Sequence, residues 1–200
     1  MIDSLLALDR ELFLFLNNLG SDPYDGFWKF ITRQINWLPF FLFMAWVVYK
    51  TLGWRKMILL LVVLGVMMVV TDQTTNLAKN TFERLRPCSN PNLDGLMREV
   101  ISRSSFSFFS GHACNSMAAA VYLMLILRRV RHIGWLVLWP LIFAYSRIYL
   151  GVHYPLDILV GFAAGGTFGW AFYKLYGFVL NKYFPKLNDA AHGEPVANRE

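Results

Sequence analysis

Cysteine is nearly absent from this sequence: Cys88 and Cys114 are the two among 200 residues. A structural zinc site needs four nitrogen or sulfur ligands in close clusters, and the positions of these two residues exclude such a site. The N-terminus also lacks an uncharged apolar run, because acidic and basic residues interrupt residues 1–20. We therefore expect no cleavable signal peptide in this segment.

Charge is also scarce, since 16% of the residues are charged and 56% are hydrophobic. The formal net charge of +6 would be compatible with a nucleic-acid partner. However, the lysines and arginines stand at the ends of long apolar runs, which is typical of residues that orient a membrane protein. The composition therefore predicts a protein whose partner is the lipid bilayer and not a nucleic acid.

The long apolar runs predict five membrane spans. The predicted spans cover residues 36–51, 57–77, 113–127, 133–150 and 155–180, and the upstream end of the first is left open. We expect an all-α, polytopic membrane bundle of about five to six helices. Residues 1–184 are expected to form one membrane-embedded domain, followed by a polar tail at 185–200.

The remaining helix is predicted at residues 4–19. Leucine and phenylalanine recur there at helical spacing, and Asp9, Arg10 and Glu11 stand largely on the opposite side. This pattern predicts an amphipathic helix that lies in the membrane interface and does not cross it.

Basic clusters follow the first, third and fifth predicted spans. Their members are Lys50, Arg55, Lys56, Arg128, Arg129, Arg131, Lys174 and Lys182. The positive-inside rule places them in the cytoplasm. The loop at 79–109 and the corner at 151–154 then lie together on the outer face of the inner membrane.

An arginine, a histidine and a carboxylate occur at that corner in the pattern Arg147-x5-His153-x3-Asp157. If Pro155 opens a helix, the Asp157 carboxylate can turn back toward the His153 imidazole. A guanidinium within an apolar run is expensive, although Arg147 would also be explained by pairing with Asp157 or by reaching to the interface. An imidazole held by a carboxylate beside a guanidinium suggests chemistry on a phosphate.

Two further clusters are expected on the same face. One contains Lys79 and Arg86 and ends in a proline, and the other is Ser110-Gly111-His112. All three clusters together supply three permanent cations, two imidazoles and a glycine-containing turn at a helix N-terminus. Cations and free backbone N–H groups are what a phosphate dianion needs.

These three motifs, in this order and with their internal spacings, resemble those of the type-2 phosphatidic-acid phosphatase superfamily. This superfamily contains integral-membrane lipid phosphate phosphatases and is related to glucose-6-phosphatase and the vanadium haloperoxidases. The resemblance covers residues 79–157, with one departure: Phe109 stands where the family usually has a proline. It implies a phosphatase that needs no metal or other cofactor, since three fixed cations replace magnesium.

The resemblance also implies a role for each motif residue. His153 would attack phosphorus and form a phosphohistidine, and Asp157 would fix the tautomer of His153. His112 would protonate the departing lipid oxygen and then activate water. The remaining residues would bind the phosphate oxygens: Lys79, Arg86, Ser110, Gly111 and Arg147.

The substrate is expected to be a lipid in the bilayer. Polyprenyl diphosphate, lipid A 1-phosphate, phosphatidylglycerol phosphate and phosphatidic acid are the candidates. The first two are favoured slightly, because extra loop arginines would meet a second phosphate unless they are only solvated: Arg84, Arg98 and Arg103. Two alternatives remain, a lipid phosphotransferase and a non-catalytic transporter or lipid-binding protein, and the oligomeric state is open.

Smaller features give local predictions. Cys88 and Cys114 would either form a disulfide, or Cys114 would be buried as a small apolar residue. Asp72 and Asn76 are expected to make hydrogen bonds between helices. Glycine recurs every fourth residue in the last span, which favours close approach of a neighbouring helix: Gly161, Gly165 and Gly169.

Overall fold

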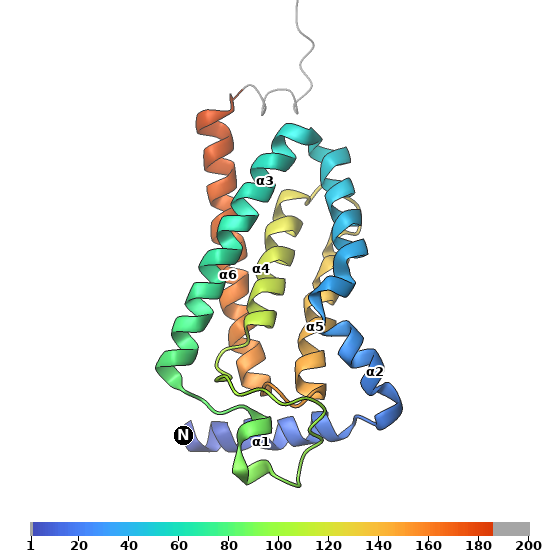
Figure 1. The fold of residues 1–200 in the computed structure, drawn as a ribbon. Coiled ribbons are helices and arrows are strands. Elements are labelled where there is room, and N and C mark those ends of the chain that lie inside the picture. The colour runs from blue at the N-terminus through green and yellow to red at the C-terminus, as the bar shows by residue number, and fades with distance from the viewer. Residues whose placement is uncertain (1, 186–200) are drawn as a thin grey trace, which may run out of the picture.

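Six α-helices form the computed structural model, which describes residues 2–185 and contains no β-strand in that range. They are α1 (Ile2–Asn18), α2 (Asp22–Ile31), α3 (Leu38–Phe82), α4 (Gly111–Ile126), α5 (Leu138–Tyr149) and α6 (Pro155–Tyr183). Short 3-10 helices occur at Gln34–Trp37, Pro87–Ser89, Pro91–Leu93 and Ile133–Val137. Helices α3 to α6 run side by side, and α1 lies across one end of this bundle (Figure 1). The all-α prediction is confirmed.

Helix α3 passes through the bundle twice. It rises from α2 to the far end of the molecule and then returns (Figure 1). The reversal occurs at Gly53, which has φ +75° and ψ 167°. A Cβ at Gly53 would meet no atom within 4 Å, so the positive φ and not crowding requires glycine here. The two halves of α3 correspond to the spans predicted at 36–51 and 57–77.

Two segments are long and apolar enough to cross a membrane, Gln34–Leu93 and Pro155–Tyr183. Shorter apolar helices occupy Gly111–Ile126 and Ile133–Tyr149. Because α3 turns back on itself, these segments give the five predicted passages. Large apolar side chains point outward along them, including Phe43, Trp46, Val62, Val66 and Leu159. Contiguous apolar surface of this kind suits contact with lipid tails.

Helices α4 and α6 pack with their backbones in close contact. A Cβ on Gly165 would lie 2.3 Å from the Cys114 carbonyl oxygen, and one on Gly161 would lie 2.8 Å from that of Ser110. Gly169 approaches Ala118 in the same way. The predicted close approach at the glycine series is confirmed, and it fixes the start of α4 against α6.

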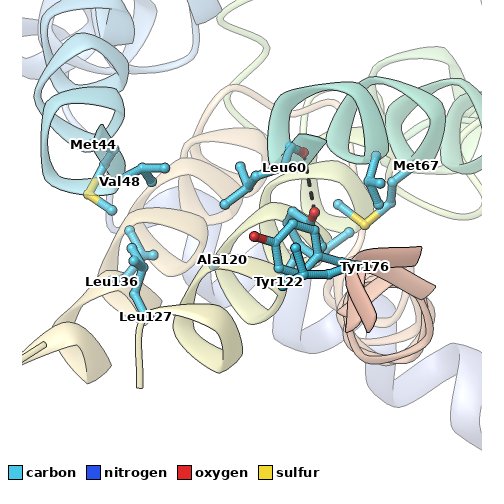
Figure 2. Close-up of a cluster of buried hydrophobic side chains, with 12 residues drawn as sticks. Met44, Val48, Leu60, Met67, Ala120, Tyr122, Leu127, Leu136 and Tyr176 are labelled. Carbon is cyan, nitrogen blue, oxygen red and sulfur yellow. Dashed lines mark hydrogen bonds between the residues drawn. The ribbon is translucent and has the colours of Figure 1, made fainter. Parts of the chain in front are cut away.

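A buried cluster in the middle of the bundle joins both passes of α3 to α4 and α6 (Figure 2). Tyr122 and Leu60 are almost completely buried, and the Tyr122 hydroxyl donates to the Leu60 carbonyl at 3.2 Å. The Tyr122 ring meets Tyr176 edge to face, with 6.2 Å between the ring centroids. This packing fixes the positions of α3, α4 and α6, which carry motif residues, relative to one another.

The predicted amphipathic helix corresponds to α1, with Asp9 on the side opposite the leucines as predicted, whereas Glu11 is exposed. The exposed side carries the apolar residues Leu5, Leu8, Leu12, Phe15 and Leu19. Asp9, Phe13 and Asn17, each four residues apart, face the protein and are buried. The polar side of α1 therefore contacts the bundle.

Helix α2 lies between the helix predicted at residues 4–19 and the first predicted span, and the sequence did not predict it. Pro23 stands in the first turn of α2, where a missing N–H costs nothing. The side chain of Asn17 donates to the Ile148 and Tyr149 carbonyls at the end of α5, at 3.1 and 3.0 Å.

The polar tail predicted from residue 185 lies outside the described residues, apart from Pro185 itself.

Candidate active site

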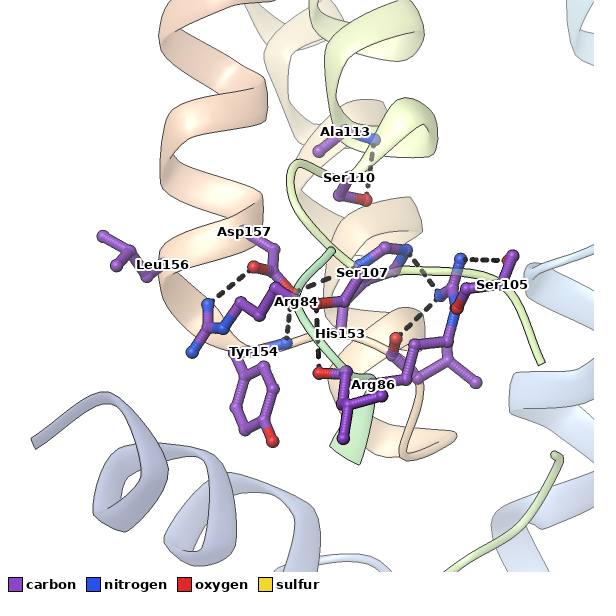
Figure 3. Close-up of polar contacts among 12 residues, drawn as sticks. Arg84, Arg86, Ser105, Ser107, Ser110, Ala113, His153, Tyr154, Leu156 and Asp157 are labelled. Atoms are coloured by element: carbon purple, nitrogen blue, oxygen red, sulfur yellow. Dashed lines mark hydrogen bonds and ion pairs between the residues drawn. The ribbon is translucent and has the colours of Figure 1, made fainter. Parts of the chain in front are cut away.

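His153 and Asp157 meet at the start of α6. Tyr154 is the N-cap, Pro155 opens the helix, and the Tyr154 N–H donates to Asp157 Oδ2 at 3.0 Å. This cap turns the carboxylate back, so that His153 Nδ1 lies 3.4 Å from the same oxygen (Figure 3). His153 is 2% exposed and Asp157 is fully buried. The local geometry predicted from the four-residue spacing is confirmed.

Arg86 contacts the other nitrogen of the His153 ring. Its Nη1 lies 3.0 Å from His153 Nε2 and also donates to the Val152 carbonyl at 2.8 Å (Figure 3). Its Nε donates to the Ser105 carbonyl at 2.7 Å. Since a guanidinium only donates, Nε2 must be the acceptor and Nδ1 carries the proton toward Asp157. The tautomer thus has its lone pair on Nε2.

The buried environment keeps the His153 imidazole neutral. Burial lowers the pKa of His153 to about 3, and this effect outweighs the hydrogen bond to Asp157, which raises it. The positive charge of Arg86 lowers the same pKa further. At neutral pH the ring therefore has a free electron pair, which a nucleophile requires.

Acidification is expected to destabilise the protein between about pH 6.5 and about pH 3 through His153. In this window the unfolded chain binds a proton at His153 and the folded chain does not, so the free energy of unfolding falls as the pH falls. Thermal unfolding in detergent over a pH series measures this slope. A His153→Gln variant should show a shallower slope, and an identical slope in both proteins would contradict this assignment.

The second motif forms the beginning of α4. Ser110 is the N-cap, and its Oγ accepts from the Ala113 N–H at 3.4 Å. The Ser110 N–H donates to the Asp157 carbonyl at 3.0 Å, which ties this motif to α6. A Cβ on Gly111 would lie 3.9 Å from Lys79 Nζ, so the half-buried ammonium of Lys79 stands beside the helix start. A cation beside a helix N-terminus is a favourable place for an anion.

His112 and Arg147 complete the group. The His112 ring packs 5.3 Å from the ring of Phe143 and interacts electrostatically with Arg147, His153 and Lys79. With the contacts above, the structure brings all eight predicted residues to one end of the bundle.

Arg147 has no carboxylate partner within residues 2–185. It is 3% exposed, its Nη1 donates to Thr32 Oγ1, and its Nε is buried without a partner. Pairing with Asp157 and reaching to the interface, the two alternatives considered from the sequence, are both excluded by this placement. A buried guanidinium without a counterion is expensive, and a bound anion would compensate it.

Arg84 belongs to the hydrogen-bond network of Asp157, although the sequence suggested only a solvated arginine or one that binds a second phosphate. Its Nη1 donates to Asp157 Oδ1 and its Nη2 to Asp9 Oδ2, both at 2.6 Å. Its guanidinium also stacks on the Tyr154 ring, 4.0 Å from the centroid. Arg84 therefore holds the oxygen of Asp157 that does not face His153 (Figure 3).

Asp9 connects α1 to this network. Its Oδ2 accepts from Arg84, and its Oδ1 accepts from the Leu156 N–H in the first turn of α6, at 2.8 Å. The four-residue spacing of Asp9, Phe13 and Asn17 was the available signal, because it marks a second stripe on α1.

Arg98 is also unavailable for a second phosphate. Its Nη2 donates to Asp22 Oδ1 at 2.7 Å and to Asp25 Oδ1 at 3.0 Å. Of the three loop arginines considered for a diphosphate, Arg103 forms no ion pair with any residue from 2 to 185, and it interacts electrostatically with His112. Arg84 and Arg98 therefore do not favour a diphosphate, because carboxylates of the protein already pair with them.

The disulfide considered from the sequence is not formed, because Cys88 and Cys114 are both free. Cys114 is completely buried in α4, as the alternative predicted. The predicted hydrogen bonding between helices is confirmed for Asp72, whose Oδ1 accepts from Asn115 Nδ2 at 2.6 Å. Within residues 2–185, no group of three or more histidine, cysteine, aspartate or glutamate side chains could hold a metal ion.

A cavity of about 430 Å³ lies beside His112, between the two passes of α3 and helices α4 and α5. Its wall is mostly apolar and includes Met44, Leu60, Leu64 and Phe143. The site therefore combines a cationic centre at the end of the bundle with an apolar chamber that extends into it. This combination suits a molecule with an anionic head and an apolar tail.

Comparison with known proteins identifies the family. The family model described as "PAP2 superfamily" matches residues 56–180. A lipid A 4′-phosphatase of Bacteroides thetaiotaomicron is 32% identical over 192 residues, which cover 94% of this chain and 83% of the relative. A lipid A 4′-phosphatase of Porphyromonas gingivalis is 27% identical over 91% of this chain and 78% of its own length.

The fold agrees with that assignment. The crystal structure of Aquifex aeolicus LpxE aligns with a TM-score of 0.63 and 26% identity, covering 84% of this chain and 95% of that one. The family predicted from the three motifs is thereby confirmed. This membrane protein belongs to the PAP2 superfamily.

Proposed function

We propose that this protein is a membrane-embedded phosphatase that hydrolyses the phosphate of a lipid through a phosphohistidine on His153. The observation that carries the proposal is the fixed tautomer of His153, with Nδ1 toward Asp157 and the lone pair of Nε2 toward Arg86. The guanidinium of Arg147, which has no carboxylate partner and whose Nε has no partner at all among residues 2–185, supports a bound anion at the same place. A protein that only binds anions has no use for a neutral imidazole oriented in this way.

In the first step, the substrate phosphate binds among Lys79, Arg86, Arg147 and the N-terminus of α4. Arg86 then exchanges its contact with Nε2 for a phosphate oxygen, which frees the lone pair. Nε2 forms the N–P bond as the bond from phosphorus to the lipid oxygen breaks. His112, which holds a proton while the phosphate dianion is bound, gives it to that oxygen, and the dephosphorylated lipid leaves.

In the second step, the neutral His112 takes a proton from water as the water oxygen attacks phosphorus. The N–P bond breaks, inorganic phosphate is released, and His153 regains its free lone pair. The three cations and the α4 N–H groups stabilise the charge on the non-bridging oxygens in both steps. Asp157 keeps the imidazole oriented and stabilises the positive charge that develops on it.

The substrate we propose is a phosphorylated membrane lipid, with lipid A as the first candidate. Two relatives that span most of this chain are lipid A 4′-phosphatases. The apolar cavity beside His112 supports a lipid tail that stays within the bundle during the reaction. Residues 1–184 would act as one phosphatase domain.

We place the site on the outer face of the inner membrane. The turn of α3 and the ends of α4 and α6 lie at the far end of the bundle from α1 and the motif residues (Figure 1). The basic residues at or just after these segments include Arg55, Arg128 and Lys182. The positive-inside rule puts that end in the cytoplasm, so the site would face outward.

Purified protein in detergent is expected to release inorganic phosphate from a lipid monophosphate, whether or not a chelator such as EDTA is present. Three fixed cations carry the charge that magnesium carries in many phosphoryl-transfer enzymes. A panel of lipid mono- and diphosphates, with the His153→Ala protein as the blank, measures this. Loss of activity with EDTA, or phosphate appearing on an acceptor lipid instead of in solution, would contradict the proposal.

A further inference from the structure

Polar side chains interrupt the apolar wall of the cavity beside His112, and three of them come from different helices. These three are Asp72 on α3, Asn115 on α4 and Trp139 on α5. Asp72 accepts from the Asn115 amide group at 2.6 Å. Asn115 Oδ1 and Trp139 Nε1 are buried and have no partner within residues 2–185. Buried polar atoms without partners destabilise a protein, so a bound ligand that forms hydrogen bonds with these two atoms would stabilise it.

The three side chains stand at a similar depth in the cavity. Helix α4 leads away from the motif residues, and Asn115 lies about one turn beyond His112. Helix α5 leads toward them, and Trp139 lies about one turn before Phe143, whose ring packs on His112. One helical turn advances about 5.4 Å. Asp72 lies about one turn before Thr75 on the returning half of α3, and a Cβ on Gly111 would lie 3.2 Å from Thr75 Cγ2.

We propose that Asp72, Asn115 and Trp139 bind a hydroxyl or amide group of the lipid substrate, about one helical turn deeper than the phosphate. This inference rests on the proposed phosphatase function. The carboxylate of Asp72 and Oδ1 of Asn115 accept hydrogen bonds, and Nε1 of Trp139 donates one. Hydroxyl and secondary amide groups both donate and accept, so either would satisfy the unpartnered atoms.

The same groups select against other lipids. The Asp72 carboxylate repels a second phosphate at this depth, and a polyprenyl chain offers no hydrogen bond to Asn115 or Trp139. The favoured class is therefore a phosphate monoester of a lipid whose backbone carries a hydroxyl or amide near the phosphate, as an acylated amino sugar does. A site built to bind such a group discriminates strongly against analogues that lack it.

The test compares two substrates, an N-acylated amino-sugar lipid monophosphate and a polyprenyl monophosphate. Trp139→Phe removes the N–H and keeps a ring, and Asn115→Ala removes the amide. Each variant is expected to raise KM for the amino-sugar lipid about tenfold with little change in kcat, because the lost contact exists before the reaction. KM for polyprenyl phosphate should stay within about twofold. Met68→Leu, which changes an apolar residue of the same wall, is the matched control.

Equal loss on both substrates would mean a structural role, and no loss on either would mean that the subsite does not exist. Both results overturn the inference. If the wild type hydrolyses neither lipid, the phosphatase function fails instead. Binding of both lipids to the His153→Ala protein, measured by the shift of its thermal unfolding, then decides the subsite alone: tighter binding of the amino-sugar lipid must disappear in Trp139→Phe.

Discussion

Replacing His153 by alanine is expected to lower lipid phosphate hydrolysis by roughly 10⁴-fold or more, since the substitution removes the attacking atom. Residual activity would come from the cations and the α4 N-terminus, which still bind the phosphate. The initial rate of phosphate release at saturating substrate measures the effect. Brief incubation with a radiolabelled lipid phosphate, followed by an alkaline quench that preserves phosphohistidine, should label the wild type and leave the variant unlabelled.

His132 provides the matched control for this experiment. It is exposed and precedes the 3-10 helix at Ile133–Val137, in the connection from the end of α4 to α5, whereas the site lies at the start of α4. Its φ of +63° is tolerated by asparagine, so His132→Asn should fold and keep full activity. If His153→Ala retained more than about a tenth of the wild-type rate, the nucleophile would have to be another group.

Replacing Arg84 by methionine is expected to lower the free energy of unfolding by about 3 kcal/mol and kcat by roughly 10²-fold. The loss of stability arises because Asp9 and Asp157 would both remain buried without their shared cation, whose side chain is 18% exposed. The loss of rate arises because Asp157 would no longer be held on the side away from His153. Denaturant or thermal unfolding in detergent and steady-state kinetics measure the two effects.

A second substitution separates these effects. Adding Asp9→Asn to Arg84→Met removes one uncompensated charge, so stability should partly recover while kcat stays low. Arg98→Met is the control, because this loop arginine pairs with Asp22 and Asp25 and does not contact His153 or Asp157. It should change kcat little. If Arg84→Met proved as active as the wild type, Arg84 would have no part in positioning Asp157.

The motif geometry could be predicted because it is local. The four-residue spacing of His153 and Asp157, with Pro155 between them, is enough to place the carboxylate under the imidazole once the helix begins. The spans could be predicted because composition alone distinguishes lipid-facing helices. His112 and Arg147 could be assigned to the same end of the bundle as His153 from the number of predicted membrane crossings alone.

The contacts of Arg84 could not be predicted in the same way. Asp9 and Asp157 are far from Arg84 in the sequence. The periodicity of a helix predicts which of its residues share a side, but it does not predict which loop residue that side contacts. Helix α2 was not predicted because Gly20 and Pro23 are typical of a turn, although proline is also common in the first turn of a helix. Interactions that depend on how whole helices dock become visible only when the packing is known.

The close contact of α4 with α6 also determines how a lipid can arrive. Since a single added methyl group at Gly165 would collide with the Cys114 carbonyl, these two helices leave no gap for a hydrocarbon chain. The chamber beside His112 is lined from α3, α4 and α5 and the short segments that precede α3 and α5, and none of its lining residues belongs to α6. A lipid is therefore expected to reach the chamber from the side of α3 and α5, because the contact between α4 and α6 is closed to it.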